Sequence, residues 1–302
     1  MEPLLGAALL LIVYLAVLAS TRSEWGILLR LVSRVCALRD QGKPDAAAEV
    51  ALQAIAAGRT FPWLINLAVE ALISAGRYSE ALAIPSKVPD AGPADATNPL
   101  LVQINLAEAE YNLGRWDAAW DRLRTLDEAA GDLAITAAGL AQQRAWILIH
   151  TGRPAEALSS WEQADIDGLP YRYHAEHHFT HAAVLLALGR FEEAEDAALA
   201  GADAAVRASS VRNSFFVRAR VAAARGDWTQ AESFCRAAAA HFYRGQGGDG
   251  LLLWGDTLLR LGRPDEARQA YELSISRDGQ SESARTAAAR LQAMDAPASK
   301  AS

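Results

Sequence analysis

A six-residue pattern that returns at a nearly fixed interval constrains the fold of this chain more than any other feature. It reads glycine, a basic residue in most copies, an aromatic residue or proline, two positions that often hold an acid, and alanine. Successive copies start 34, 38, 38, 37, 37 and 36 residues apart. A period in this range indicates a solenoid of stacked units. The seven copies begin at Gly42, Gly76, Gly114, Gly152, Gly189, Gly226 and Gly262.

Each position of the pattern suits a turn between two helices. The glycine follows an apolar run with helical spacing, and a residue in the left-handed region commonly ends a helix, a conformation that costs glycine no side-chain clash. The basic residue suits the negative end of the first helix, while proline or an acid suits the start of the second. Alanine at the sixth position lets two helices approach closely. The pattern therefore predicts a helix–turn–helix unit.

Small side chains recur on both sides of this turn. The residue seven places before each glycine is small or β-branched, and the residue twelve places after it is small in five copies. This combination resembles the tetratricopeptide repeat (TPR) from about Gly26 to the C-terminal helix. The resemblance implies an all-α, right-handed α-solenoid of about seven TPR-like repeats, in which the first helices line a concave groove. A helix over 281–294 lacks the six-residue pattern and is expected to cap the last repeat.

The N-terminus predicts a membrane anchor. Residues 3–21 carry no charge over 19 positions, and a helix of that length spans about 28 Å, close to the hydrocarbon thickness of a bilayer. Basic residues follow the segment, so the positive-inside rule predicts a single-pass anchor in the cell (inner) membrane with the solenoid in the cytoplasm. The alternative is a cleaved signal peptide with its cleavage site near Val17–Ala19, although Met1–Pro3 contain no lysine or arginine.

Three segments are expected: an anchor over 1–22, a TPR solenoid over 23–294, and a disordered tail over 295–302. A run rich in proline, aspartate and alanine at 89–99 predicts a loop that could act as a hinge. Cys36 and Cys235 are expected to stay unpaired, because distant repeats of a solenoid should not touch, and unpaired thiols suit a reducing compartment.

Composition argues against several classes of function. The net charge of −7 disfavours a nucleic-acid partner. No CxxC pair and no Ser–His–Asp or Cys–His arrangement stands out. The chain is therefore expected to be no enzyme and to need no cofactor.

Two motifs need an interpretation of their own. His174, His177, His178 and His181 share one helical stripe, and adjacent imidazoles can bind a metal. The favoured interpretation is packing, with His178 and His181 facing the second helix of their repeat and no metal bound. The second motif, over Gly245–Gly250, matches GxGxxG, but no strand precedes it, so it is expected to be a linker.

The resemblance to the tetratricopeptide repeat implies a groove for protein or peptide partners along the first helices. Asparagine, tyrosine and arginine side chains on such a surface can bind a peptide backbone, and aromatic rings supply buried area. The first-repeat positions where a C-terminal carboxylate clamp would place lysine and asparagine are Val32 and Cys36, so that clamp is not expected. The predicted groove residues are Asn66, Glu70, Asn105, Glu108, Tyr111, Asn112, Gln142, Trp146, His150, Phe179, Phe216 and Arg220.

The resulting hypothesis is a membrane-tethered, non-catalytic adaptor or scaffold for protein–protein interaction. Three alternatives remain open at this point. The chain could be a secreted or periplasmic TPR protein after signal cleavage, a metal-binding protein that uses the histidine stripe, or a homo-oligomer that forms a coat.

Overall fold

A computed structural model describes residues 24–59, 62–84, 97–126, 134–162, 173–205, 208–240 and 248–296. Within these ranges the secondary structure is helical, with no β-strand. In the described ranges, the helices form seven pairs and a single C-terminal helix. They are α2 (Glu24–Asp40) with α3 (Pro44–Ala56), α4 (Pro62–Ser74) with α5 (Tyr78–Leu82), α6 (Thr97–Asn112) with α7 (Trp116–Arg124), α9 (Ala134–His150) with α10 (Pro154–Glu162), α11 (His174–Ala187) with α12 (Phe191–Asp203), α13 (Ala208–Ala224) with α14 (Trp228–Ala239), α15 (Gly248–Arg260) with α16 (Pro264–Arg277), and α17 (Glu282–Asp295).

The glycine of every pattern copy ends the first helix of its pair, as predicted. All seven have φ between 71° and 79°. In the copy at Gly189, the glycine N–H donates to the carbonyl of Leu186 at 3.0 Å, and the N–H of Arg190 donates to the carbonyl of Leu185 at 2.9 Å. This pair of bonds is a Schellman motif, which satisfies carbonyls that the helix end leaves open.

The basic residue after the glycine has a partner that the sequence interpretation missed. In the copy at Gly189, Arg190 donates from Nε and Nη2 to the two carboxylate oxygens of Glu193, at 2.7 and 2.5 Å. The same bidentate pair forms in three other copies, Arg77–Glu80, Arg153–Glu156 and Arg263–Glu266. The copy without a basic residue carries Asp227, whose Oδ1 instead accepts the N–H of Gln230 at 3.0 Å. Each device therefore supports the start of the second helix.

Small side chains lie where the paired helices touch, as predicted. The alanine that closes the pattern is fully buried in all seven copies. Gly201 shows how tight the contact is, because a Cβ built there would lie 2.4 Å from Cε1 of Phe179 on the facing helix. The spacing of small residues thus sets the distance between the two helices of a unit.

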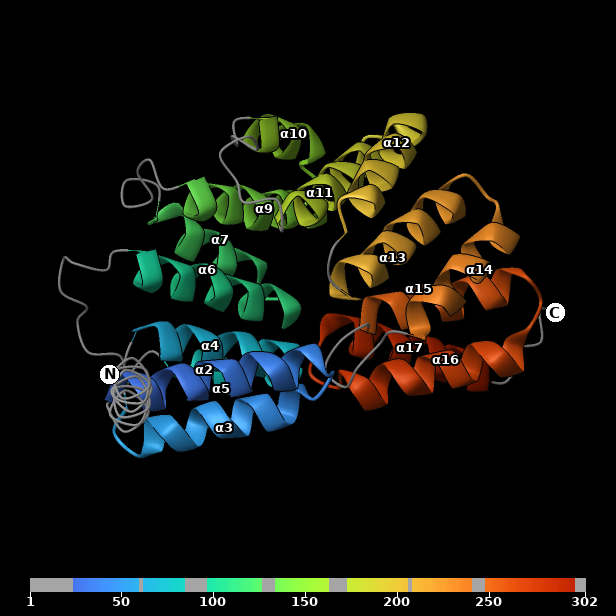
Figure 1. Ribbon diagram of the computed structural model, residues 1–302. Coiled ribbons are helices and arrows are strands. Elements are labelled where there is room, and N and C mark those ends of the chain that lie inside the picture. Colours follow the sequence, from blue (N-terminus) through green and yellow to red (C-terminus); the bar gives the residue numbers. More distant parts are fainter. Residues whose placement is uncertain are drawn as a thin grey trace, which may run out of the picture.

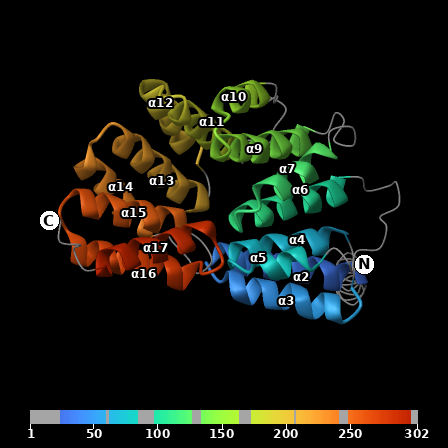
Figure 2. The same ribbon diagram turned by 180° about the vertical axis from the view of Figure 1, so that it is seen from behind.

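The stack of pairs curves into a ring, so that α16 and α17 lie near α5 and the end of α6 (Figures 1 and 2). The expectation that distant repeats do not touch is wrong. Three hydrogen bonds form this seam: Tyr78 Oη donates to Asp278 Oδ2 at 3.2 Å, the Ser79 N–H donates to Gln280 Oε1 at 3.3 Å, and Arg285 Nη2 donates to the carbonyl of Leu113 at 2.9 Å. Ring closure turns the predicted concave groove into the inner surface of the ring, which is called the lumen below.

Several predicted boundaries lie outside the described residues, including the anchor over 1–22 and most of the loop and the tail. None of the helices in the described ranges has the length and hydropathy that a membrane span requires. The predicted loop at 89–99 extends too far, since Thr97 already begins α6. Pro99 is compatible with this start because proline is tolerated in the first turn of a helix. At the other end, α17 includes Asp295, which the sequence assigned to the tail.

Candidate functional site in the lumen of the ring

The N-terminal part of the lumen is a ladder of polar side chains on α2, α4 and α6. Asn105 Nδ2 donates to Asn66 Oδ1 at 2.9 Å, and Asn66 Nδ2 donates to Glu70 Oε1 at 2.8 Å. Glu70 also accepts a hydrogen bond from Arg39. Three predicted groove residues are therefore brought together, and their hydrogen bonds already join the first three repeats.

An aromatic stack follows on α6, α7 and α9. The rings of Tyr111 and Trp116 lie 5.8 Å apart with an interplanar angle of 8°, and Trp116 and His150 lie 4.6 Å apart at 12°. Trp146 is tilted against His150 at 6.0 Å. The stack places three predicted residues on one wall, together with Trp116, which the sequence assigned only to the turn.

Arg220 on α13 lies near two predicted aromatic residues. Its guanidinium carbon lies 5.6 Å from the ring centroid of Trp146 and 5.9 Å from that of Phe216. These distances are within the range of a cation–π contact. Burial lowers the pKa of Arg220 from its ordinary value. The contact links the inner surfaces of repeats four and six.

Two predicted groove residues stand apart from these contacts. Phe179 is wrongly assigned to the groove, because its side chain is only 3% exposed and fills the space that Gly201 leaves on α12. Gln142 is half-buried on α9. Phe179 therefore belongs to the packing inside repeat five.

Two histidines of the stripe, His177 and His181, pack on the preceding repeat, whereas the sequence predicted that His181 would face the second helix of its own repeat. The rings of His177 and His181 stack on Trp161 of α10, with centroids 4.4 and 3.8 Å away. Burial lowers the pKa of His177 to about 4. Among the described residues, no group of three histidine, cysteine or acidic side chains could hold a metal ion. The stripe thus serves the contact between repeats four and five.

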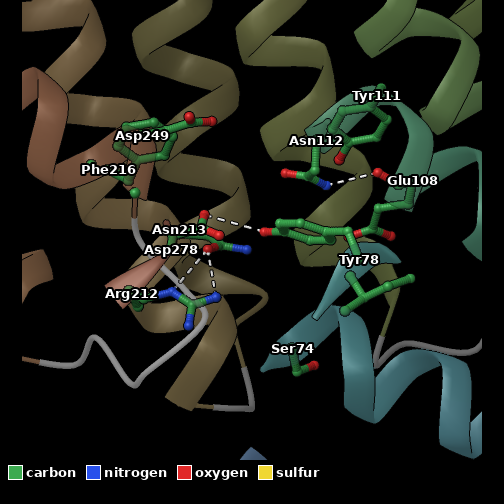
Figure 3. Close-up of a pocket in the computed structure, with 13 residues that line it drawn as sticks. Ser74, Tyr78, Glu108, Tyr111, Asn112, Arg212, Asn213, Phe216, Asp249 and Asp278 are labelled. Carbon is green, nitrogen blue, oxygen red and sulfur yellow. Dashed lines mark hydrogen bonds between the residues drawn. The ribbon is translucent and has the colours of Figure 1, made fainter. Parts of the chain in front are cut away.

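The centre of the lumen holds a cavity of about 210 Å³ beside the seam (Figure 3). Its lining includes the predicted residues Glu108, Tyr111, Asn112 and Phe216. A neighbouring cavity of about 210 Å³ shares Tyr111 and Asn112 and reaches His150. Ring closure thus places predicted groove residues around two adjoining spaces.

Sequence reasoning missed the other residues that line the central cavity, among them Tyr78, Asp249 and Asp278. Tyr78 belongs to a turn pattern, Asp249 to the glycine-rich motif, and Asp278 follows the last repeat. No local signal brings them together, since only the closure of the ring does so. The glycine-rich motif was expected to be a linker, but its described part, from Gly248 on, lies in α15. Gly248 serves this packing, because a Cβ there would lie 2.8 Å from Asp278 Oδ2.

The acids of this cavity are held in their neutral form more readily than usual. Burial raises the pKa of Glu108 to about 7, against a smaller opposing effect of the hydrogen bond that its Oε2 accepts from Gln143 Nε2 at 3.1 Å. Burial also raises the pKa of Asp278 to about 7, and it raises the pKa of Asp249. Removal from water disfavours a carboxylate unless a cation is close. The site can therefore bind and orient polar groups. A bound cation would favour the charged form of these carboxyl groups.

Comparisons with solved structures find the same fold in proteins of low sequence identity. A Rap protein complexed with competence and sporulation factor is 15% identical over 84% of this chain and 77% of that chain, with a TM-score of 0.58. The APC/C heterotetramer Cut9–Hcn1 is 12% identical over 88% of this chain and 50% of that chain, with a TM-score of 0.62. The chain thus spans half the length of that relative. A tetratricopeptide repeat protein from Parabacteroides merdae is 14% identical over 86% of this chain and 98% of that chain, with a TM-score of 0.50.

Family models give the assignment. One model of the tetratricopeptide repeat matches residues 32–96 and 216–282, and a second matches 143–163 and 175–200. No curated protein matches the sequence significantly. The matched segments lie on the helix pairs described above, and the turn geometry agrees with them. The chain belongs to the tetratricopeptide repeat family.

Proposed function

We propose that this protein is a membrane-tethered adaptor that holds an extended segment of a partner protein in the lumen of its ring, without catalysing a reaction. The observation that carries the proposal is the pair of adjoining cavities at the centre of the lumen. Side chains from several repeats converge there and offer both amide groups and ring faces, as in Asn112, Tyr111 and Phe216. Solenoids present such inner surfaces to peptides. The Rap structure with competence and sporulation factor is consistent with this use of the fold.

The proposed tether is the uncharged segment over 3–21, with the solenoid on the cytoplasmic side. Tethering raises the effective concentration of the adaptor for partners at the same membrane without any new contact. Extraction of membranes at alkaline pH tests the tether, and the proposal requires that the full chain stays with the lipid. N-terminal sequencing distinguishes the rival, since a mature chain that begins near Ser20 would mean a cleaved signal.

Capture of partners by the full chain tests the binding role. We expect the triple variant Asn105→Ala, Tyr111→Ala, Asn112→Ala to lose partners, because it removes ring area and amide groups from the lumen. The matched control is Asp117→Ala, Asp121→Ala, Arg124→Ala, which changes three exposed residues on α7 of the same repeat. Capture of the same partners by the wild type and both variants would show that the lumen is not the binding surface.

A further inference from the structure

Three carboxylates surround the central cavity from three different elements. Glu108 lies on α6, Asp249 in the first turn of α15, and Asp278 directly after α16. In the described part of the chain, none of the three forms an ion pair with lysine or arginine. Their hydrogen-bond donors are the neutral side chains of Gln143, Ser283 and Tyr78. Among the described residues, the cavity thus gathers three carboxylates, none of which has an ion-pair partner.

Asp278 is the carboxylate of this cavity with an oxygen that can still accept a hydrogen bond. Its side chain is 5% exposed and lines the cavity, where Figure 3 shows the Tyr78 ring reaching toward it. Oδ2 accepts the hydroxyl of Tyr78, but the buried Oδ1 has no hydrogen-bond partner among the described residues. A buried acceptor without a donor costs free energy that a ligand donor can recover. The ligand that fits this oxygen is a hydrogen-bond donor.

The surroundings favour an organic cation over a metal ion. The described residues offer no group of three acids, histidines or cysteines that could hold a metal. The aromatic residues Tyr78, Tyr111 and Phe216 also line the cavity, and ring faces attract ammonium and guanidinium groups. A volume of about 210 Å³ is far above the roughly 10–15 Å³ that one water needs.

We propose that this cavity receives a lysine or arginine side chain of the partner segment, with Asp278 as its principal acceptor and Glu108 and Asp249 as further negative charges. The inference rests on the proposed function, because the basic side chain belongs to the segment held in the lumen. It adds the chemical class of residue that the partner must carry.

One cation of the protein also lines the cavity, and it leaves the charge balance negative. Arg212 donates from Nε and Nη2 to Asn213 Oδ1, at 3.2 and 3.1 Å. The guanidinium of Arg220 also attracts Asp249 and opposes the rise of its pKa. Two guanidinium groups thus oppose three carboxylates, so an added positive charge still improves the balance. The raised pKa values of Glu108 and Asp278, both about 7, agree with carboxylates that burial has separated from a counterion.

Selection from a library of acetylated, amidated heptapeptides tests the inference with the full chain in detergent micelles. Blocked termini ensure that only side chains carry charge. We expect lysine or arginine to dominate at one position of the selected peptides. Replacing that residue with norleucine, which keeps the apolar chain and removes the charge, is expected to weaken binding about tenfold or more, the scale of one hydrogen bond between charged groups. Fluorescence anisotropy measures the affinities.

Variants of the protein assign the preference to this cavity. In Asp278→Asn, whose side chain can still accept the Tyr78 hydroxyl, the lysine and norleucine peptides should bind with nearly equal affinity. Glu108→Gln should reduce the difference as well, and it provides the decisive comparison if Asp278→Asn does not fold. The control Glu272→Gln removes one negative charge from an exposed position and should keep the full difference.

The other outcomes are distinguishable. Selected peptides without a basic position, or with an acidic one, would overturn the inference and leave peptide binding intact. A preference for a basic residue that is equal in all variants would also overturn the inference, because the positive charge would then be recognised outside this cavity. If no peptide binds, the proposed function fails and the inference fails with it.

Discussion

Asp278 illustrates how far one residue can depart from its ordinary chemistry when a fold closes around it. An aspartate at the end of a helical repeat is usually solvated, but here ring closure leaves it 5% exposed. Its pKa rises to about 7, chiefly through burial, and the Tyr78 hydroxyl opposes the shift only in part. At neutral pH, folding therefore has to place a partly charged group in a poorly hydrated site.

The sign of this effect predicts a pH-dependent stability difference. The folded-state pKa of Asp278 is raised, so protonated Asp278 contributes to the free energy of unfolding. This contribution is complete below about pH 4 and is lost as the pH rises to about 7. Asp278→Asn does not titrate, so we expect it to be more stable than the wild type at pH 8, by about 1–3 kcal/mol. The advantage should shrink at pH 5. Urea unfolding followed by circular dichroism at both pH values measures the difference, and a variant less stable at pH 8 would contradict this account.

At the scale of the element, the helix pair is the part of the molecule that the sequence predicts best. The left-handed glycine, the buried alanine and the small residues on facing helices all follow from local rules, and the structure confirms them. Phe179 shows the limit of register arguments. Its helical position alone did not reveal that Gly201 opens a space for the ring on the facing helix.

The contact between Phe179 and Gly201 predicts a specific energetic coupling. Gly201→Ala would place a methyl group against the ring, so we expect a loss of about 1–3 kcal/mol in stability from overpacking. Adding Phe179→Leu should recover part of that loss, because the smaller side chain leaves room for the methyl group. A double-mutant cycle by thermal unfolding measures the coupling. Additive effects of the two substitutions would mean that the methyl group is accommodated elsewhere.

At the scale of the whole molecule, the seam is what sequence reasoning could not reach. The repeats specify how each unit stacks on its neighbour, and small rotations per repeat accumulate into overall curvature. Whether the last unit meets the second depends on the sum of those rotations, which no single motif encodes. Tyr78, Asp249 and Asp278 therefore enter the site only through tertiary structure, whereas Glu108, Tyr111 and Asn112 were accessible from the register of one helix.

The seam also predicts a change in shape when it is weakened. Gln280→Ala and Arg285→Ala together remove two of the three hydrogen bonds that join the ring. Both are on the exposed side of the seam, so we expect the helix content to stay the same while the radius of gyration increases. Small-angle X-ray scattering of the detergent-solubilised chain with contrast matching detects the change. An unchanged scattering curve would show that packing at the cavity is enough to keep the ring shut.

Closure of the ring has a kinetic consequence for any partner. An extended chain that passes through a closed ring can enter only by threading a free end or by waiting until the seam opens. Association would then be limited by opening and not by diffusion, and dissociation would be slow for the same reason. A partner recognised through an internal segment would need the seam to part, whereas one recognised through its terminus would not. The three hydrogen bonds of the seam would thus set the residence time of a bound partner without contacting that partner.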